Sequence, residues 1–250
     1  MQIQVNDLNI HFQVYGQGSP LVIIPGWGDR SDNWYNVAQL LAKNFQVFVL
    51  DLPGFGVSDP PPQPWNIDDY TNIVKGFLKE MEIEKPILLG HSHGGKVSCT
   101  IAGEENGKCR ALILVSASGV DIPSLSVKAK ILWFKAIKLL TKPLGKLGEK
   151  IVDHYRNKLG SRDYKEAGAI RATMVKVVNH KLFSALPKIN IPTVILWGSD
   201  DKTLDVKQAK TFEKLIKDSY IKLIWGANHH PHLSHPQELA EFSGEFLATL

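Results

Sequence analysis

The stretch Gly90-His91-Ser92-His93-Gly94-Gly95 decides the fold of this chain. It follows an apolar run, Lys85 to Leu89, that predicts a buried strand, and it precedes Lys96 to Ala102, which predicts a helix. A strand, the pattern G-x-S-x-G and a helix in this order are typical of a nucleophile elbow, a tight turn with an exposed serine at its tip. The sequence therefore predicts that Ser92 stands at the end of a strand.

The glycines of this turn meet its steric demands. Gly90 and Gly94 lie two residues before and after the serine, where the backbones nearly touch and leave no room for a side chain. Gly95 lets the helix pack closely on the strand. The turn lifts the Ser92 hydroxyl clear of the sheet, beside a helix N-terminus whose free N–H groups stabilise negative charge.

The rest of the chain alternates apolar runs with segments of helical period, which indicates an α/β fold with a mainly parallel sheet covered on both faces. Including the strand before the elbow, we expect eight strands. The other seven are predicted at Ile3–Val5, Ile10–Tyr15, Leu21–Ile24, Val47–Leu50, Ala111–Val115, Thr193–Trp197 and Ile221–Trp225. Further helices are predicted at Asn33–Lys43, Ile67–Met81, Val206–Ile216 and Pro236–Leu247.

One segment differs chemically from the rest. Residues 119–190 carry fifteen Lys and Arg against five Asp and Glu, a net charge of +10, whereas the remainder has a net charge of −6. Helical patterns dominate this segment and no strand pattern occurs in it. We expect residues 1–118 and 191–250 to form one core domain and residues 119–190 to form an inserted helical lid. The length of 250 residues suits a single α/β unit of this kind.

Composition and the N-terminus point to a compartment. Met1 to Asp7 lacks the basic start and apolar stretch of a signal peptide. No apolar run approaches the ~20 residues of a membrane span, and two cysteines, Cys99 and Cys109, provide no disulfide framework. We expect a cytoplasmic protein without a transmembrane segment.

A serine hydroxyl becomes a nucleophile only with a base in hydrogen-bond reach and an acid that orients the base. On this topology the chain order is serine, acid, histidine. Gly198-Ser199-Asp200-Asp201 follows a predicted strand, so Asp201 is the candidate acid and Asp200 the alternate. Asp121, after the preceding strand, is a third option. An aspartate that merely forms a turn is the structural alternative for each.

The candidate base lies in the loop after the last strand, residues 226–236. Its histidines are His229, His230, His232 and His235. His229 is nearest to the sheet edge and is the candidate base. The other three raise the question of a metal site, but Pro231 and Pro236 interrupt helical spacing and structural zinc sites often use cysteines. We expect no metal.

An oxyanion hole needs two backbone N–H groups near the serine. The residue after the nucleophile, His93, is expected to provide one. The loop Pro25-Gly26-Trp27-Gly28, after the Leu21–Ile24 strand, is expected to provide the other from Trp27. The alternative is a glycine-rich turn that binds nothing.

Five motifs in this order resemble those of the α/β-hydrolase superfamily, and most of all its compact, lid-bearing branch of serine esterases and carbon–carbon-bond hydrolases. They are Ile24-Pro25-Gly26-Trp27-Gly28, Asp51-Leu52-Pro53-Gly54-Phe55-Gly56-Val57-Ser58-Asp59, the Gly90–Gly95 elbow, Trp197-Gly198-Ser199-Asp200-Asp201 and Gly226-Ala227-Asn228-His229. The resemblance covers nearly the whole chain outside residues 119–190. It implies an α/β-hydrolase fold, with Asp201, three residues after a glycine, as the acid and His229 as the base.

The chain also departs from the family pattern. Pro25 stands where many relatives have histidine, and Leu204-Asp205 occupies a region where proline is frequent. His93 follows the nucleophile where Met, Phe or Gln is more familiar. Serine rather than aspartate at position 92 argues against the dehalogenases and epoxide hydrolases of the superfamily.

The predicted lid has two chemically distinct faces, and Pro143 and Gly145 are expected to interrupt its helices. The apolar set is Trp133, Phe134, Ile137, Leu140 and Leu144, and the basic set is Lys135, Lys138, Lys142 and Lys146. A solvated face is the simplest interpretation of the lysines. Attraction of an anionic substrate and contact with an anionic membrane surface are the functional ones. No nucleic-acid recognition motif is present.

From the motifs we expect a cofactor-free serine hydrolase that cleaves a carboxylic ester or a related acyl small molecule. Two main alternatives stay open, and a perhydrolase or lyase variant ranks below them. One is a hydrolase that cleaves the carbon–carbon bond of a diketone-type substrate with the same triad. The other is a ligand-binding sensor that retains the triad and turns over slowly.

Overall fold

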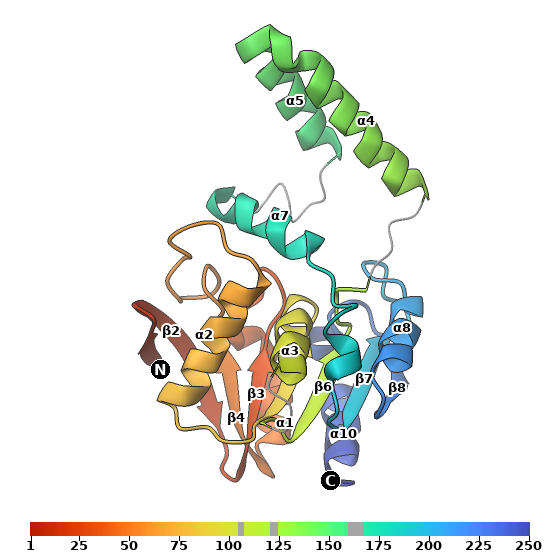
Figure 1. Cartoon of the computed structure of the whole chain (residues 1–250). Coiled ribbons are helices and arrows are strands. Elements are labelled where there is room, and N and C mark those ends of the chain that lie inside the picture. Colours follow the sequence, from red (N-terminus) through yellow and green to blue (C-terminus); the bar gives the residue numbers. More distant parts are fainter. Residues whose placement is uncertain (105–107, 121–124, 160–167) are drawn as a thin grey trace.

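A computed structural model of the chain describes residues 1–104, 108–120, 125–159 and 168–250. Its centre is an eight-stranded sheet with the order β1-β2-β4-β3-β5-β6-β7-β8 (Figure 1). The strands are β1 (Gln2–Val5), β2 (Leu8–Tyr15), β3 (Ser19–Ile24), β4 (Phe45–Leu50), β5 (Ile87–His91), β6 (Ala111–Val115), β7 (Thr193–Gly198) and β8 (Ser219–Ile224). β1 and β2 run antiparallel to their neighbours, and all the pairs from β4 to β8 are parallel. The prediction of a mainly parallel eight-stranded α/β sheet is confirmed.

Helices cover both faces of the sheet because the central strands are apolar on both sides. Val22 and Ile24 of β3 pack in one core cluster with residues of α2 (Ile67–Glu80), α3 (His93–Glu104) and α8 (Lys207–Leu215). Leu21 and Ile23 pack in a second cluster with α1 (Tyr35–Leu41) and α10 (Pro236–Leu247). In Figure 1, α2, α3 and α8 lie in front of the sheet and α1 and α10 behind it.

Hydrogen bonds to side-chain carboxylates and amides explain where two of the helices start. Asn66 caps α2: its side-chain oxygen accepts the N–H of Asp69, and the Asp69 carboxylate accepts the N–H of Asn66. The helix predicted from Asn33 instead begins as a 3-10 turn, η1 (Ser31–Trp34), which passes directly into α1. The buried Asp51 carboxylate accepts the Ser31 N–H at this turn and ties it to the end of β4.

The part of residues 119–190 that the structure describes contains helices and no strand. They are α4 (Leu125–Thr141), η2 (Lys142–Leu144), α5 (Gly145–Leu159), η3 (Gly168–Ile170), α7 (Arg171–Asn179) and η4 (Leu186–Lys188). The 3-10 turn at Lys142–Leu144 separates α4 from α5, as Pro143 and Gly145 predict. α4 and α5 pack together as a hairpin that projects from the core above the carboxyl ends of the strands (Figure 1). α9 (Pro231–Ser234) completes the helices of the C-terminal part.

Candidate active site

Ser92 stands in the turn between β5 and α3 with a backbone φ of +48°. A non-glycine residue with positive φ is uncommon and carries strain that the surrounding structure must hold. The serine is partly exposed, whereas its neighbours His91 and His93 are buried. Within this turn, Ser92 is therefore accessible while the residues on either side of it are buried.

The glycines around Ser92 are required by close backbone contacts. A Cβ atom added at Gly90 would come within 2.6 Å of the Gly94 carbonyl oxygen, and one at Gly94 within 1.9 Å of the Ile24 oxygen. At Gly95 it would lie 2.6 Å from the Ala117 side chain, in the loop after β6. The close approach of Gly90 to Gly94 is thus as expected from the sequence, whereas the tightest limit at Gly94 comes from Ile24 of β3 and that at Gly95 from the loop after β6.

His229 bridges Ser92 and Asp201. Its Nε2 lies 3.2 Å from the Ser92 Oγ and its Nδ1 lies 2.7 Å from the Asp201 Oδ2. The three residues come from the ends of β5, β7 and β8 and are separated by up to 137 positions in the chain. The structure therefore brings together the three side chains that were selected from the sequence.

The Asp201 carboxylate is held by more than the histidine. Its Oδ1 accepts hydrogen bonds from the N–H groups of Thr203 and Leu204, both at 2.8 Å. Burial acts to raise the pKa of Asp201, but the hydrogen bonds from His229 and from this backbone outweigh it and lower the pKa. Because the chain has Leu204 rather than a proline here, that N–H is available as a donor. Asp201 is consequently a fixed anion at neutral pH.

His91 was not singled out by the sequence analysis, yet it supports the base. Its ring is buried, and its Nε2 lies 2.8 Å from the backbone carbonyl oxygen of His229. Since a carbonyl oxygen only accepts, His91 Nε2 carries the proton. Burial, together with the charges of His232 and His229, holds the pKa of His91 well below its usual value, so the ring is neutral. The elbow motif showed the residue, but only the fold shows its partner.

The loop after β3 lies directly beside the serine. A Cβ atom added at Gly26 would be 3.5 Å from the Ser92 Cβ. The Trp27 ring contacts the His93 ring at a centroid distance of 5.7 Å. Because His93 begins α3, its N–H has no acceptor within the helix. The two backbone groups expected to form an oxyanion hole thus come from neighbouring segments, and their role stays a prediction.

The His93 side chain packs between aromatic rings. It contacts Tyr70 at 4.8 Å as well as Trp27, and neither of its ring nitrogens has a hydrogen-bond partner. Burial and the nearby Lys96 ammonium lower the pKa of His93 to about 3. The residue after the nucleophile is therefore a neutral, polar ring inside an apolar environment.

Of the two alternative acids, Asp200 and Asp121, only Asp200 lies in the part of the chain that the structure describes. Asp200 is exposed, and its carboxylate accepts a hydrogen bond from the Ser199 hydroxyl at 3.0 Å. Asp121 is not among the described residues. His235 lies beyond the triad and contacts the Ser234 hydroxyl through Nδ1. These contacts favour Asp201 over Asp200.

His232 is buried in a second polar group behind the triad. Its ring stacks on Trp34 at 4.2 Å with an interplanar angle of 5°. Its Nε2 lies 3.2 Å from the Asp29 Oδ2, although the angle is not that of a formed hydrogen bond. Burial acts to raise the pKa of Asp29, but His232 and Asn33 outweigh it and lower the pKa. An anionic Asp29 thus lies beside a second histidine of the same loop.

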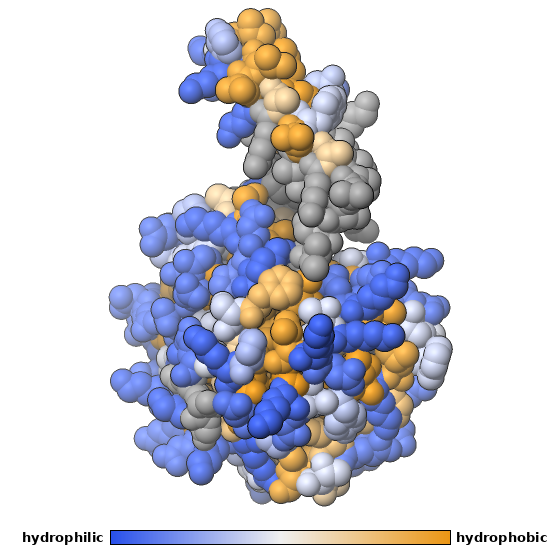
Figure 2. Space-filling view, turned by 45° about the vertical axis from the view of Figure 1, so that its right-hand side comes forward, coloured by the Kyte–Doolittle hydropathy of each residue, from blue (hydrophilic) through white to orange (hydrophobic). Residues whose placement is uncertain are grey.

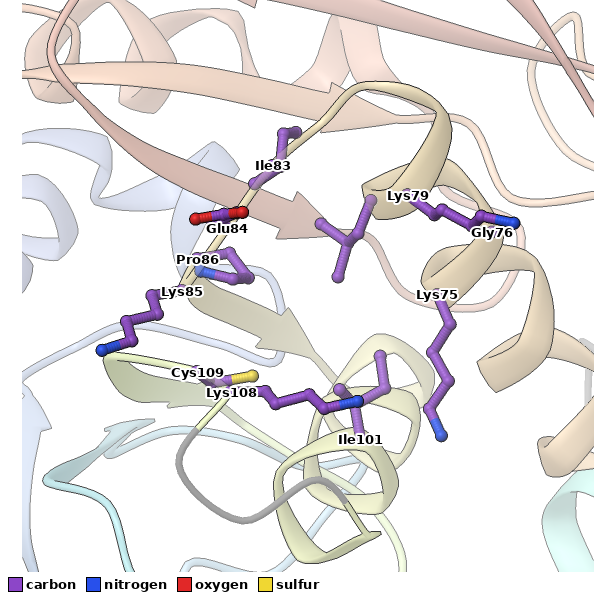
Figure 3. A pocket seen from close by; sticks show the side chains of 11 residues that line it. Lys75, Gly76, Lys79, Ile83, Glu84, Lys85, Pro86, Ile101, Lys108 and Cys109 are labelled. Carbon is purple, nitrogen blue, oxygen red and sulfur yellow. The ribbon is translucent and has the colours of Figure 1, made fainter.

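A surface cavity of about 590 Å³ lies far from this site, at the amino ends of β5 and β6 (Figure 3). Lys75, Lys79, Lys85 and Lys108 line it together with Glu84 over an apolar floor. Parallel α/β sheets bind ligands outside the carboxyl ends of their strands, which is where Ser92 lies. The cavity is therefore separate from the candidate active site.

None of the helices in the described part of the chain combines the length and apolarity that a membrane span requires.

The chain is similar in sequence to a known protein family and to several hydrolases. The profile described as "alpha/beta hydrolase fold" matches residues 19–159. A pimeloyl-[acyl-carrier protein] methyl ester esterase of Legionella pneumophila (strain Corby) is 28% identical over 251 residues, which cover 96% of this chain and 100% of that protein. A 2-hydroxy-6-oxo-6-(2'-aminophenyl)hexa-2,4-dienoic acid hydrolase of Metapseudomonas resinovorans is 28% identical over 247 residues, or 93% of this chain and 85% of that protein.

A solved structure gives a similar result. The crystal structure of a membrane phospholipase A, described as a bacterial virulence factor, superposes with a TM-score of 0.80 at 25% identity. The match covers 100% of this chain and 85% of that one. The similar proteins thus include hydrolases that act on different bonds.

Proposed function

The chain belongs to the alpha/beta hydrolase fold family, and from that premise we propose that it is a serine hydrolase that cleaves a carboxylic ester or a related acyl substrate. The observation that carries the proposal is the continuous series of contacts from Ser92 Oγ through His229 to Asp201. The similarity to a methyl ester esterase along almost the entire chain supports the choice of an ester.

In the proposed reaction, Nε2 of His229 takes the Ser92 proton while the Oγ attacks the substrate carbonyl carbon. Asp201 holds the imidazole through Nδ1 and stabilises its charged form. The imidazolium then protonates the leaving alcohol, which departs and leaves an acyl-enzyme. Water, deprotonated by His229, then attacks the acyl carbon. The bond between this carbon and the Ser92 Oγ breaks, the imidazolium returns its proton to the Oγ, and the carboxylic acid product leaves. The Oγ–Nε2 distance of 3.2 Å is compatible with tightening when substrate binds.

The oxyanion of the tetrahedral intermediate would be bound by the N–H groups of Trp27 and His93. The proximity of the Gly26 backbone to Ser92 supports this assignment. The N-terminus of α3 adds a favourable dipole at the same place. No cofactor takes part in this scheme.

A carbon–carbon-bond hydrolase is the second candidate. The same triad is compatible with cleavage of a diketone-type substrate, and a dienoic acid hydrolase is as similar in sequence as the esterase. A ligand-binding sensor with slow turnover is the third candidate. It differs from both in that a ligand would bind without product release.

The projecting hairpin supports the proposal that residues 119–190 form a lid, inserted in a core domain of residues 1–118 and 191–250. Phe134 and Ile137 are partly buried, whereas other apolar side chains of the hairpin are exposed. The exposed ones are Leu132, Trp133, Leu139, Leu140, Leu144 and Leu147. Figure 2 shows apolar side chains gathered at this projecting end. Exposed apolar side chains gathered on one hairpin suit a lid that contacts an apolar substrate chain.

The lysines of the hairpin suggest the charge of the partner. Lys138, Lys142 and Lys146 are exposed beside the apolar residues. Such a pattern attracts an anionic small-molecule substrate, and it also fits transient contact with an anionic membrane surface. We propose the anionic acyl substrate as the main partner, since the apolar residues and the lysines share one hairpin above the serine.

Labelling with a fluorophosphonate probe and peptide mapping tests the nucleophile. We expect modification at Ser92 in the native protein and none in Ser92→Ala. Absence of labelling at Ser92 in the folded protein would contradict the hydrolase proposal and favour the sensor. Hydrolysis rates over an aryl ester chain-length series, compared with cleavage of a diketone-type substrate, then separate the two enzyme candidates.

A further inference from the structure

Three histidines from distant parts of the chain gather behind the triad. His91 comes from the end of β5, and His230 and His232 come from the loop after β8 and from α9. One potential ligand atom of each lies within 4.8 Å of those of the other two. Their ring centroids are 4.9 to 5.6 Å apart. The fold therefore creates a three-imidazole cluster from residues that chain spacing does not connect.

The two buried members of this cluster have ring nitrogens without a partner. His91 donates its Nε2–H to the His229 carbonyl, so its Nδ1 carries a lone pair, and this atom has no hydrogen-bond partner. His91 is 1% exposed. A buried acceptor without a partner destabilises the folded chain. An occupant that accepts this lone pair would remove the penalty.

His232 has a similar arrangement. Its ring is 1% exposed and held in position by stacking on Trp34. The Asp29 carboxylate lies 3.2 Å from its Nε2, while its Nδ1 has no partner. A carboxylate or backbone carbonyl next to one ring nitrogen is the usual outer support of a histidine that binds metal through the other. Here the His229 carbonyl accepts the Nε2–H of His91, and the Asp29 carboxylate lies beside the Nε2 of His232, where a small rotation would form the same support.

We propose that His91, His230 and His232 form a binding site for Zn²⁺ or a similar divalent metal ion. Imidazole nitrogens suit Zn²⁺, Cu²⁺ and Ni²⁺, and three of them with a water molecule complete a tetrahedral zinc site. Zn–N bonds of about 2.0–2.1 Å place ligand nitrogens roughly 3.3 Å apart. No pair of ligand atoms must therefore approach by more than about 1.5 Å. Rotation of the exposed His230 side chain can bring its nitrogen toward the other two, and the two buried rings must supply any approach between themselves.

The expectation of no metal rests on the spacing of the loop histidines and on the frequent use of cysteine in structural zinc sites. The third ligand, His91, comes from the elbow, and its approach to the loop depends on the parallel sheet. Gly26 also matters, because a Cβ atom there would lie 2.7 Å from the His91 Nδ1. The absence of a side chain at Gly26 leaves this nitrogen uncovered.

The proposed metal site is linked to His229 of the triad in two ways, by a peptide bond and by a hydrogen bond. His230 directly follows His229, and His91 holds the His229 carbonyl. If Ser92 is the nucleophile proposed above, metal binding restrains the base and slows hydrolysis. This consequence rests on the proposed function, whereas binding of the ion does not.

Titration of chelator-treated protein with Zn²⁺, and with Co²⁺ for its visible ligand-field spectrum, tests the site. We expect one ion per chain with the spectrum of a nitrogen-ligated tetrahedral ion. His230→Ala should weaken binding by at least about 100-fold, and so should His232→Phe, which keeps the ring stacked on Trp34. His235→Ala is the matched control, because it removes a histidine of the same loop outside the cluster. It should bind as the parent does.

Absence of saturable binding at one ion per chain would overturn the proposal. Binding that His230→Ala and His232→Phe leave unchanged would also overturn it, as would an equal loss in His235→Ala. Ser92→Ala keeps the test of metal binding independent of the proposed hydrolase function. This variant should bind the ion with parental affinity whether or not Ser92 is a nucleophile.

Discussion

Replacing Asp201 by asparagine tests the assigned acid, and the structure predicts how the new side chain will lie. Oδ1 of Asp201 accepts two backbone N–H groups, from Thr203 and Leu204, and Oδ2 faces Nδ1 of His229. An amide oxygen accepts and an amide nitrogen donates. The asparagine oxygen must therefore remain with the two backbone donors. Its NH₂ group must face His229.

This orientation changes the tautomer of His229. The asparagine NH₂ donates to Nδ1, so the proton of the neutral ring moves to Nε2, the atom 3.2 Å from the Ser92 Oγ. A protonated Nε2 cannot accept the serine proton. In serine proteases the same tautomer change lowers kcat by about 10⁴, which is about 5.4 kcal/mol at 1.36 kcal/mol per tenfold change in rate. We expect a loss of this size here.

The assay is hydrolysis of a short aryl ester, together with the rate of fluorophosphonate labelling at Ser92. Thermal denaturation checks that the variant is folded, because the asparagine keeps both backbone hydrogen bonds. Asp200→Asn is the matched control, since Asp200 is exposed and contacts only the Ser199 hydroxyl among the side-chain contacts described. It should retain nearly full activity.

A folded Asp201→Asn variant within about tenfold of the parental rate would refute the tautomer reasoning. A large loss in Asp200→Asn with little loss in Asp201→Asn would instead transfer the role of the acid to Asp200.

Three further predictions concern the elbow, the response to acid and the buried thiols. Gly94→Ala should destabilise the fold by about 3 kcal/mol, because its Cβ would lie 1.9 Å from the Ile24 oxygen. Calorimetry should show a Tm lower by ~6–12 °C. The control is Gly244→Ala, which should not lower the Tm because a Cβ there meets nothing within 4 Å. Since the pKa of Asp201 is lowered in the folded chain, its stabilisation is present above the ordinary aspartate pKa of ~3.9 and is lost as the pH falls through the folded value. Melting curves should accordingly show a steeper acid loss in the parent than in Asp201→Asn, and parallel curves would contradict this linkage. Burial raises the pKa of the Cys99 thiol, so alkylation mapped by mass spectrometry should modify Cys99 only after denaturation, and its rapid modification in native protein would show that α3 opens.

Much of the fold could be predicted because its signals are local. Val22 and Ile24 alternate with Leu21 and Ile23, and both sets are apolar, which is typical of a strand covered on both faces. The predicted strand Ala111–Val115 and the predicted helix Pro236–Leu247 have the bounds that the structure shows. The helix predicted from Asn33 differs at its start, because a contact with Asp51, the residue after β4, holds the first turn.

The sequence by itself determined the elbow, since the steric limit between Gly90 and Gly94 acts between residues four positions apart, although Gly94 also faces Ile24 of β3. It also determined which loops follow which strands, and therefore the candidates Ser92, Asp201 and His229. Only the tertiary structure decided which ring nitrogen of His229 faces which partner, that His91 supports its carbonyl, and that His232 lies beside Asp29. His229 and Asp201 are 28 positions apart and the other pairs are more than a hundred apart, so their distances depend on how the whole sheet assembles and not on any local pattern.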